Sequence, residues 1–170
     1  MSRFIRCGEL RSTDGDGFYL PFLLAMKNGV FRGDIEVTKD MVKNGRLDFP
    51  FEIKEVTGSF YCKGKKLKSL EGAPQKVGKN FDCGDNKLTS LKGAPQKVGG
   101  YFDCSGNELT SLIGAPEKVG DSFWCDNNKL TTLKGAPKKV GGYFYCSNNT
   151  KQFTEEEVRA VCNVKGRVIV

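Results

Sequence analysis

The chain contains 170 residues, which suffices for one compact domain or one short array of repeats. Charged residues make up 28% of it and the formal net charge is +7. The longest apolar run, residues 19–26, is too short to span a membrane, so no membrane partner is expected. Histidine is absent, which excludes Ser-His-Asp and Cys-His nucleophiles and HExxH metal sites. Because no secretory leader is visible, we expect a cytoplasmic protein.

Residues 1–57 do not repeat cleanly and are interpreted as an N-terminal cap of mixed α/β structure with one degenerate repeat. The apolar run at residues 19–26 favours a short helix, with a strand as the alternative. Residues 33–37 match the strand segment of the later repeats. An apolar alternation then leads into the array through Leu47, Phe49, Phe51, Ile53 and Val56.

Residues 58–149 form an array of repeats with a period of 21 residues. The unit at residues 78–98 recurs at 99–119 and 120–140, with a less regular copy before it and a truncated copy after it. The alternation in Phe-x-Cys predicts a short strand whose Phe and Cys side chains point inward. The inward phenylalanines are Phe60, Phe81, Phe102, Phe123 and Phe144.

The other constant positions of the unit predict one turn and a continuous core. Asparagine follows each cysteine by three residues, and its amide is expected to bond the backbone of its own and the adjacent coil. Two leucines fill the interior, Gly-Ala-Pro reverses the chain and a valine closes the core. The asparagines are Asn86, Asn107, Asn128 and Asn149, and the valines are Val77, Val98, Val119 and Val140. One coil buries too little apolar surface to fold alone, so the coils must stack.

Five of the seven cysteines stand at the same place in each repeat, at Cys62, Cys83, Cys104, Cys125 and Cys146. The chain has no CxxC pair, which metal sites and small disulfide frameworks normally contain. We therefore expect reduced, buried thiols, with no bound metal and no other cofactor.

The motif Phe-x-Cys-x-x-Asn-x-Leu resembles the L-x-L-x-x-N-x-L core of leucine-rich repeats. With the tail Leu-Thr-Ser-Leu-x-Gly-Ala-Pro, residues 56–170 are similar to small leucine-rich-repeat proteins encoded by tailed bacteriophages. The resemblance implies an α/β repeat solenoid with parallel strands on one face, and a phage origin; the family has no uniform activity to transfer. Lys65 replaces the expected Asn and Lys151 the expected Leu, so the end coils should have their own arrangements.

Residues 150–170 are interpreted as a C-terminal cap made of a helix and a strand, because a solenoid must cover its apolar ends. The segment Thr154-Glu-Glu-Glu157 matches a capping box and predicts a helix start. Gly166 is expected to turn the chain into a strand at residues 167–170. The helix face expected to pack on the core contains Val158, Val161 and Cys162.

The strand positions beside the inward Phe and Cys are predicted to point outward, and they vary between repeats. Stacked strands about 4.8 Å apart would bring several aromatic residues into one patch edged by aspartates. Trp and Tyr dominate binding hot spots, although aromatic residues also simply suit strands. The predicted protein-binding residues are Tyr61, Asp82, Tyr101, Asp103, Trp124, Asp126, Tyr143 and Tyr145, and the same outward rows include Ser59 and Ser122.

Lysines form a second candidate surface, because residues 58–149 contain 14 Lys, 8 acidic residues and no Arg. Such a row attracts nucleic-acid phosphates, but lysines without arginine also suit a solvated rim that prevents edge pairing. The candidate anion-binding residues are Lys63, Lys65, Lys66, Lys76, Lys97, Lys118 and Lys139.

No catalytic residue is predicted. Asp82 and Asp103 are neighbours on an open sheet without an evident cleft to perturb them. The segment Asp14-Gly-Asp-Gly17 lacks the further ligands and final Glu of a calcium loop, and is interpreted as a turn.

The favoured hypothesis is a non-enzymatic protein-binding solenoid. In the phage setting that the resemblance implies, it would bind and modulate or inhibit a bacterial host protein, such as a defence factor, in the host cytoplasm. One alternative is RNA or DNA binding along the lysine row, with aromatic residues stacking on bases. The other is a structural or assembly role in a virion.

Overall fold

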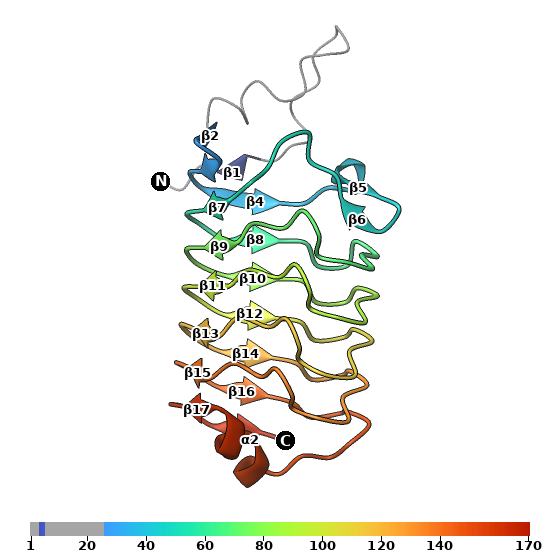
Figure 1. Cartoon of the computed structure of the whole chain (residues 1–170), viewed down its shortest axis with the longest axis vertical. Helices are drawn as coiled ribbons and strands as arrows, with labels where there is room; N and C mark the ends of the chain where they lie inside the picture. Colours follow the sequence, from blue (N-terminus) through green and yellow to red (C-terminus); the bar gives the residue numbers. More distant parts are fainter. Residues whose placement is uncertain (1–3, 6–25) are drawn as a thin grey trace, which may run out of the picture.

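A computed structural model describes residues 4–5 and 26–170 of the chain. In this part the protein is a parallel β-solenoid of about 7 turns, with the coils stacked along its long axis (Figure 1). The repeat solenoid predicted from the sequence is therefore confirmed. Since one coil buries little apolar surface, the fold depends on contacts between neighbouring coils.

Two eight-stranded sheets run along the solenoid. The first, which we call the Phe sheet, contains in spatial order β1 (Phe4–Ile5), β4 (Asp34–Glu36), β8 (Phe60–Tyr61), β10 (Phe81–Asp82), β12 (Phe102–Asp103), β14 (Phe123–Trp124), β16 (Phe144–Tyr145) and β18 (Val168–Ile169). The second, which we call the Val sheet, contains β2 (Met26–Lys27), β3 (Val30–Phe31), β7 (Glu55–Val56), β9 (Lys76–Val77), β11 (Lys97–Val98), β13 (Lys118–Val119), β15 (Lys139–Val140) and β17 (Asn163–Val164). Their arrows point in opposite directions in Figure 1, because each coil passes through one sheet and returns through the other.

The Val sheet is an addition to the architecture expected from the sequence, which predicts strands on one face only. Each regular coil contributes one Lys-Val pair, and equivalent residues pair in parallel register, as Lys97 does with Lys118. A two-residue strand is too short for apolar alternation to be recognised. The sheet forms because coils of equal length place the same backbone atoms side by side.

The N-terminal part begins the solenoid, as predicted for residues 33–37. Strand β4 pairs in parallel with β8, with Ile35 opposite Phe60. Met26 lies in strand β2, whereas the rest of the segment at 19–26 and the turn at 14–17 lie outside the described residues. The expected mixed α/β cap contains strands and one short 3-10 helix, Lys39–Met41, in its described part.

Two antiparallel hairpins in this part were missed by the sequence analysis. Strands β2 and β3 are joined through Asn28-Gly29, and β5 (Val42–Lys43) and β6 (Arg46–Leu47) through Asn44-Gly45. All four turn residues have positive φ, from 54° to 78°. Asn-Gly favours this two-residue turn, so the signal was present in the sequence.

The apolar alternation from Leu47 to Val56 is not one continuous strand. Only its two ends are in strands, β6 and β7, and the chain between them is irregular. Leu47, Ile53 and Val56 are buried, while Phe49 and Phe51 are only partly buried. Phe49 packs edge-on against Phe60 at 6.3 Å between ring centroids, so this segment covers the first Phe of the array.

The inward phenylalanines stack into a continuous column inside the solenoid. Successive ring centroids from Phe60 to Phe144 lie 5.5, 5.2, 5.5 and 5.1 Å apart. All five rings are fully buried, beside leucines from the far turn of each coil and valines from the Val sheet. The predicted core positions of Phe, Leu and Val are therefore confirmed.

Asparagine side chains form a second column and link each coil to its neighbour. The Asn107 amide nitrogen donates to the carbonyl oxygens of Cys83, Cys104 and Ser105 at 3.0–3.1 Å. Its Oδ1 accepts from the backbone N–H of Leu88 at 3.0 Å. Asn86 and Asn128 repeat this pattern, as predicted. Each amide thus satisfies buried backbone groups of two coils at once.

The C-terminal cap also follows the prediction, except at one residue. Helix α2 (Glu155–Val161) begins with a capping box, in which Thr154 Oγ1 accepts from Glu157 N at 3.2 Å and Glu157 Oε2 accepts from Thr154 N at 2.9 Å. Val158 and Cys162 are buried against the last coil, but Val161 is 47% exposed, so its predicted packing is wrong. The helix ends at Val161, which therefore faces outward rather than following the buried stripe.

The six cysteines that the structure describes are free and buried, as expected from the sequence. Burial raises the pKa of the Cys83, Cys104 and Cys125 thiols well above the ordinary value, and it raises the pKa of Cys146 to about 11. The Sγ of each of these first three residues lies 3.2–3.3 Å from a backbone carbonyl oxygen of the next coil, to which the thiol donates. A protonated, enclosed thiol is a poor nucleophile.

We expect Asn107→Ala to lower the free energy of unfolding by about 2–4 kcal/mol, because buried backbone groups of two coils lose their partners. Urea unfolding measures this change. Asn163→Ala is the matched control, since Asn163 is exposed and its side chain has no hydrogen bond among the described residues. A loss below about 0.5 kcal/mol for Asn107→Ala would contradict the role assigned to the asparagine column.

We also expect the six described cysteines to resist a thiol reagent at pH 8 for as long as the protein is folded. The Cys7→Ser variant removes the seventh cysteine, which lies outside the described residues. In this variant no thiol should react within minutes in native buffer, and all six should react in guanidinium. Rapid labelling of one or more thiols in the folded protein would contradict the burial of the column.

Candidate functional site

The outward side chains of the Phe sheet form straight rows, because neighbouring strands pair without a shift. The central row contains Glu36, Tyr61, Asp82, Asp103, Trp124, Tyr145 and Ile169. We use the name acid–aromatic face for the eight predicted binding residues, Tyr61, Asp82, Tyr101, Asp103, Trp124, Asp126, Tyr143 and Tyr145. All eight lie in this row or within two residues of its strands.

Four aromatic rings of this face form one contiguous group, as predicted. The Tyr101 and Trp124 centroids are 4.8 Å apart, and the Trp124 and Tyr145 centroids 5.8 Å apart. Tyr143 continues the group at 6.1 Å from Tyr145, edge-on. The rings are partly buried by one another and partly exposed, with Tyr143 the most exposed at 45%.

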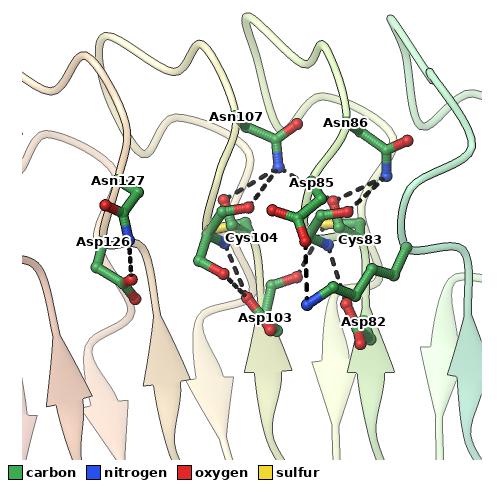
Figure 2. A network of polar contacts seen from close by, with 12 residues as sticks. Asp82, Cys83, Asp85, Asn86, Asp103, Cys104, Asn107, Asp126 and Asn127 are labelled. Carbon is green, nitrogen blue, oxygen red and sulfur yellow. Dashed lines mark hydrogen bonds and ion pairs between the residues drawn. The ribbon is translucent and has the colours of Figure 1, made fainter.

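The aspartates of the face are held by local hydrogen bonds (Figure 2). Asp82 Oδ1 accepts from Gly84 N at 3.0 Å, and Asp103 Oδ1 accepts from both the N–H and the hydroxyl of Ser105 at 2.8 and 2.6 Å. Asp126 accepts from the side-chain amide of Asn127 at 2.6 Å. These bonds fix the carboxylates in place without supplying a positive charge.

The electrostatics of the face are those of crowded carboxylates. Burial, followed by the charge of Asp103, raises the pKa of Asp82, and the pKa of Asp126 is raised by the same two causes. Burial raises the pKa of Tyr101 to about 12, and the negative charges of Tyr61, Asp82 and Asp103 contribute to this rise. Among the described residues, no ion pair reaches Asp82, Asp103 or Asp126. The face therefore has unneutralised negative charge on a protein with a net charge of +7.

Three residues expected to be outward are buried instead. Asp103 is only 9% exposed, because neighbouring side chains and Ser105 cover its carboxylate. Ser59 and Ser122 are 3% and 6% exposed, and their hydroxyls accept backbone N–H groups of the next coil, from Asn80 and Tyr143. Small hydroxyl residues at this position serve the stacking of coils rather than the surface.

The sequence analysis missed Asp85, whose carboxylate pairs with Lys63 at 3.2 Å between Nζ and Oδ2. Asp85 has a φ of 53°, and the equivalent Asn127 and Asn148 have a φ of 54°. Left-handed backbone favours Gly, Asn and Asp, so residue type at this position follows from the turn. In the sequence, the recurrence of Gly, Asn or Asp at this position once per repeat indicates the turn.

The candidate lysines divide into two groups. Lys63, Lys65 and Lys66 lie in the turn after the Phe-sheet strand β8, where Lys63 is already paired with Asp85. Lys76, Lys97, Lys118 and Lys139 lie in the Val sheet, in consecutive strands and in register. Phe and Val side chains pack between the two sheets, so these four lysines and the acid–aromatic face lie on opposite sides of the solenoid. The structure does not bring the aromatic residues to these lysines.

Neither a metal site nor a membrane span is found in the part of the chain that the structure describes. No group of three or more Cys, Asp or Glu side chains is arranged there to hold a metal ion. No helix in residues 4–5 and 26–170 is long and apolar enough to cross a bilayer.

Comparison with known proteins gives no relative: no protein-family model matches the chain, and neither does any curated protein or solved structure.

We expect Asp82→Asn to stabilise the protein at pH 7. The pKa of Asp82 is raised by folding, so the folded state binds this proton more tightly than the unfolded state, and the ionised carboxylate costs stability above that pKa. Asparagine keeps the acceptor for Gly84 N and removes the charge repulsion with Asp103. Removing this repulsion should raise the free energy of unfolding by about 0.2–1 kcal/mol.

Urea unfolding at two pH values measures this effect. The gain should be present at pH 7 and should disappear at pH 3, below the ordinary aspartate pKa, where the carboxyl is protonated in both states. Asp48→Asn, at an exposed position, serves as the control. A gain that persists unchanged at pH 3 would show that charge is not its cause.

Proposed function

We propose that the protein is a non-enzymatic protein-interaction module that binds its partner through the acid–aromatic face. The observation that carries this proposal is the contiguous group of four partly exposed rings at Tyr101, Trp124, Tyr143 and Tyr145. Trp and Tyr supply large contact area at low entropic cost and dominate binding hot spots. The rings rest on a rigid stacked sheet, so little ordering is required on binding.

The charge of the face supports a partner with basic groups. Asp82 and Asp126 flank the rings and have no ion pair among the described residues. Arg or Lys side chains of a partner would neutralise these carboxylates and contact the ring faces through cation–π interactions. Complementary charge of this kind also raises the rate of association and disfavours acidic proteins.

The resemblance to small phage leucine-rich-repeat proteins supports a bacterial host protein as the partner. In that setting the module acts in the host cytoplasm by occluding a surface of the host protein, as an inhibitor of a defence factor would. The array has the shape that repeat proteins use for such binding, an extended surface of regularly spaced side chains.

Affinity capture from bacterial lysate tests this proposal with wild-type protein and with Trp124→Ala/Tyr145→Ala. Loss of one hot spot typically costs 2 kcal/mol or more, about 30-fold in affinity, so the double variant should lose partner recovery. Ile113→Ala/Val161→Ala is the matched control, because both residues are exposed apolar side chains away from the face, at 50% and 47% exposure. Equal recovery by all three proteins would refute the assignment of the face.

A further inference from the structure

The outer surface of the Val sheet has a row of positive charge that the protein itself does not neutralise. Lys97, Lys118 and Lys139 are exposed, and each stands directly beside the next in the sheet. Lys76, the first of the row, is paired with Glu55 at 2.7 Å. None of the other three has an ion pair with a described residue. We use the name lysine row for these three residues.

This arrangement is unfavourable for the isolated protein. Like charges directly opposite one another in a sheet destabilise it. The fold accommodates opposite charges in neighbouring coils, because Lys138, next to Lys139, pairs with Glu117 of the preceding coil at 2.8 Å. Three successive lysines are therefore not required by the stacking of the coils.

A groove of about 520 Å³ accompanies the lysine row along four coils. It is lined by the lysines of the Val sheet and Lys165, by the valines Val77, Val98 and Val119, and by the glycines that follow the valines, Gly78, Gly99, Gly120 and Gly141. A Cβ on Gly99 would lie 2.1 Å from the carbonyl oxygen of Gly78, the equivalent glycine of the preceding coil. A Cβ on Gly120 would lie 1.9 Å from that of Gly99. Close coil stacking therefore requires glycine, and these positions add no side chain to the groove.

We propose that this groove binds the sugar–phosphate backbone of a single-stranded nucleic acid, aligned with the solenoid axis. Sheet spacing places a positive charge about every 4.8 Å along the groove, and the long, flexible lysine side chains can adjust to successive phosphates of a single strand. Lysine binds phosphate as a point charge, without the fixed geometry of arginine. Neither arginine nor an aromatic residue lines the groove, so the contact reads the backbone and not the bases.

An acidic peptide fits the groove less well than a nucleic acid does. A bound peptide strand gains most of its affinity by pairing with an exposed sheet edge. The lysine row lies on the face of the Val sheet, whose backbone groups are already paired between coils. In a nucleic acid the charges are part of the chain itself, so the chain needs no backbone pairing to place them against the lysines.

This site is independent of the acid–aromatic face, which lies on the other side of the core. Fluorescence polarisation with a labelled 20-mer of deoxythymidine tests it at 50 and 200 mM salt. Three phosphate contacts on a single strand predict a fall in affinity of about 20-fold between these two concentrations.

Charge-reversed variants distinguish binding in the groove from a general effect of the protein's net charge. Lys97→Glu/Lys118→Glu/Lys139→Glu should abolish the binding, and Lys97→Gln/Lys118→Gln/Lys139→Gln should weaken it by at least 20-fold at 50 mM salt while keeping the fold. Lys68→Glu/Lys92→Glu/Lys134→Glu has the same net charge as the first variant but changes exposed lysines outside the groove, and it should bind within about threefold of wild type.

Three results would overturn the proposal. The first is that the 20-mer does not bind at 50 mM salt. The second is that the groove Lys→Glu variant and the Lys68/Lys92/Lys134 variant lose the same affinity for the 20-mer. The third is that a 20-residue polyglutamate binds more tightly than the 20-mer. A 20-mer of mixed sequence that binds within threefold of deoxythymidine supports backbone recognition, and a larger difference contradicts it. Trp124→Ala/Tyr145→Ala should leave the affinity unchanged, so this test does not depend on the proposed protein partner.

Discussion

Every coil of this protein must repeat the path of the coil before it, because its backbone hydrogen bonds run to its neighbours. Phe81 N–H donates to the carbonyl of Tyr101, and Phe102 N–H to that of Ser122, both at 2.9 Å. The asparagine column adds side-chain bonds at the turn, where the backbone alone would leave buried groups without partners. Extra residues can be accommodated only outside the strands, as in the longer end coils, where Ile35 still pairs with Phe60 and Phe144 with Val168.

Stacking of identical coils has a direct consequence for the surface. A residue type that recurs in the sequence becomes a line of identical side chains about 4.8 Å apart in space. Inside the protein such lines are favourable, since phenylalanine rings stack on one another at 5.1–5.5 Å. Outside, the same rule concentrates charge of one sign, as in the lysine row. The two sheets thereby give the molecule an acidic, aromatic side and a basic side.

The two ends of the solenoid use local structure instead of the repeat. At the C-terminus, Arg159 of helix α2 donates to the carbonyl oxygens of Val164 and Gly166 at 2.9 and 3.0 Å and ties the last strands to the helix. Near the N-terminus, β2 pairs antiparallel with β3 at the end of the Val sheet, and β5 and β6 form a separate pair. Both ends add local structure to the stacked strands, a helix at one end and hairpins at the other, as the capping of an open array requires.

The sequence by itself determined the repeat, the inward Phe, Cys, Leu and Val, the asparagine column and the capping box at Thr154, because each is a local pattern that recurs or has a known geometry. It also predicted which aromatic residues would meet, since equal spacing fixes the rows. Only the tertiary structure decided that Lys-Val pairs form a second sheet, that Asp103 and Ser122 are buried, and that the lysine row lies opposite the rings. Those properties depend on the path by which one coil turns back on itself and on which side chains its neighbours cover. The spacing of residues along the chain contains no information on either.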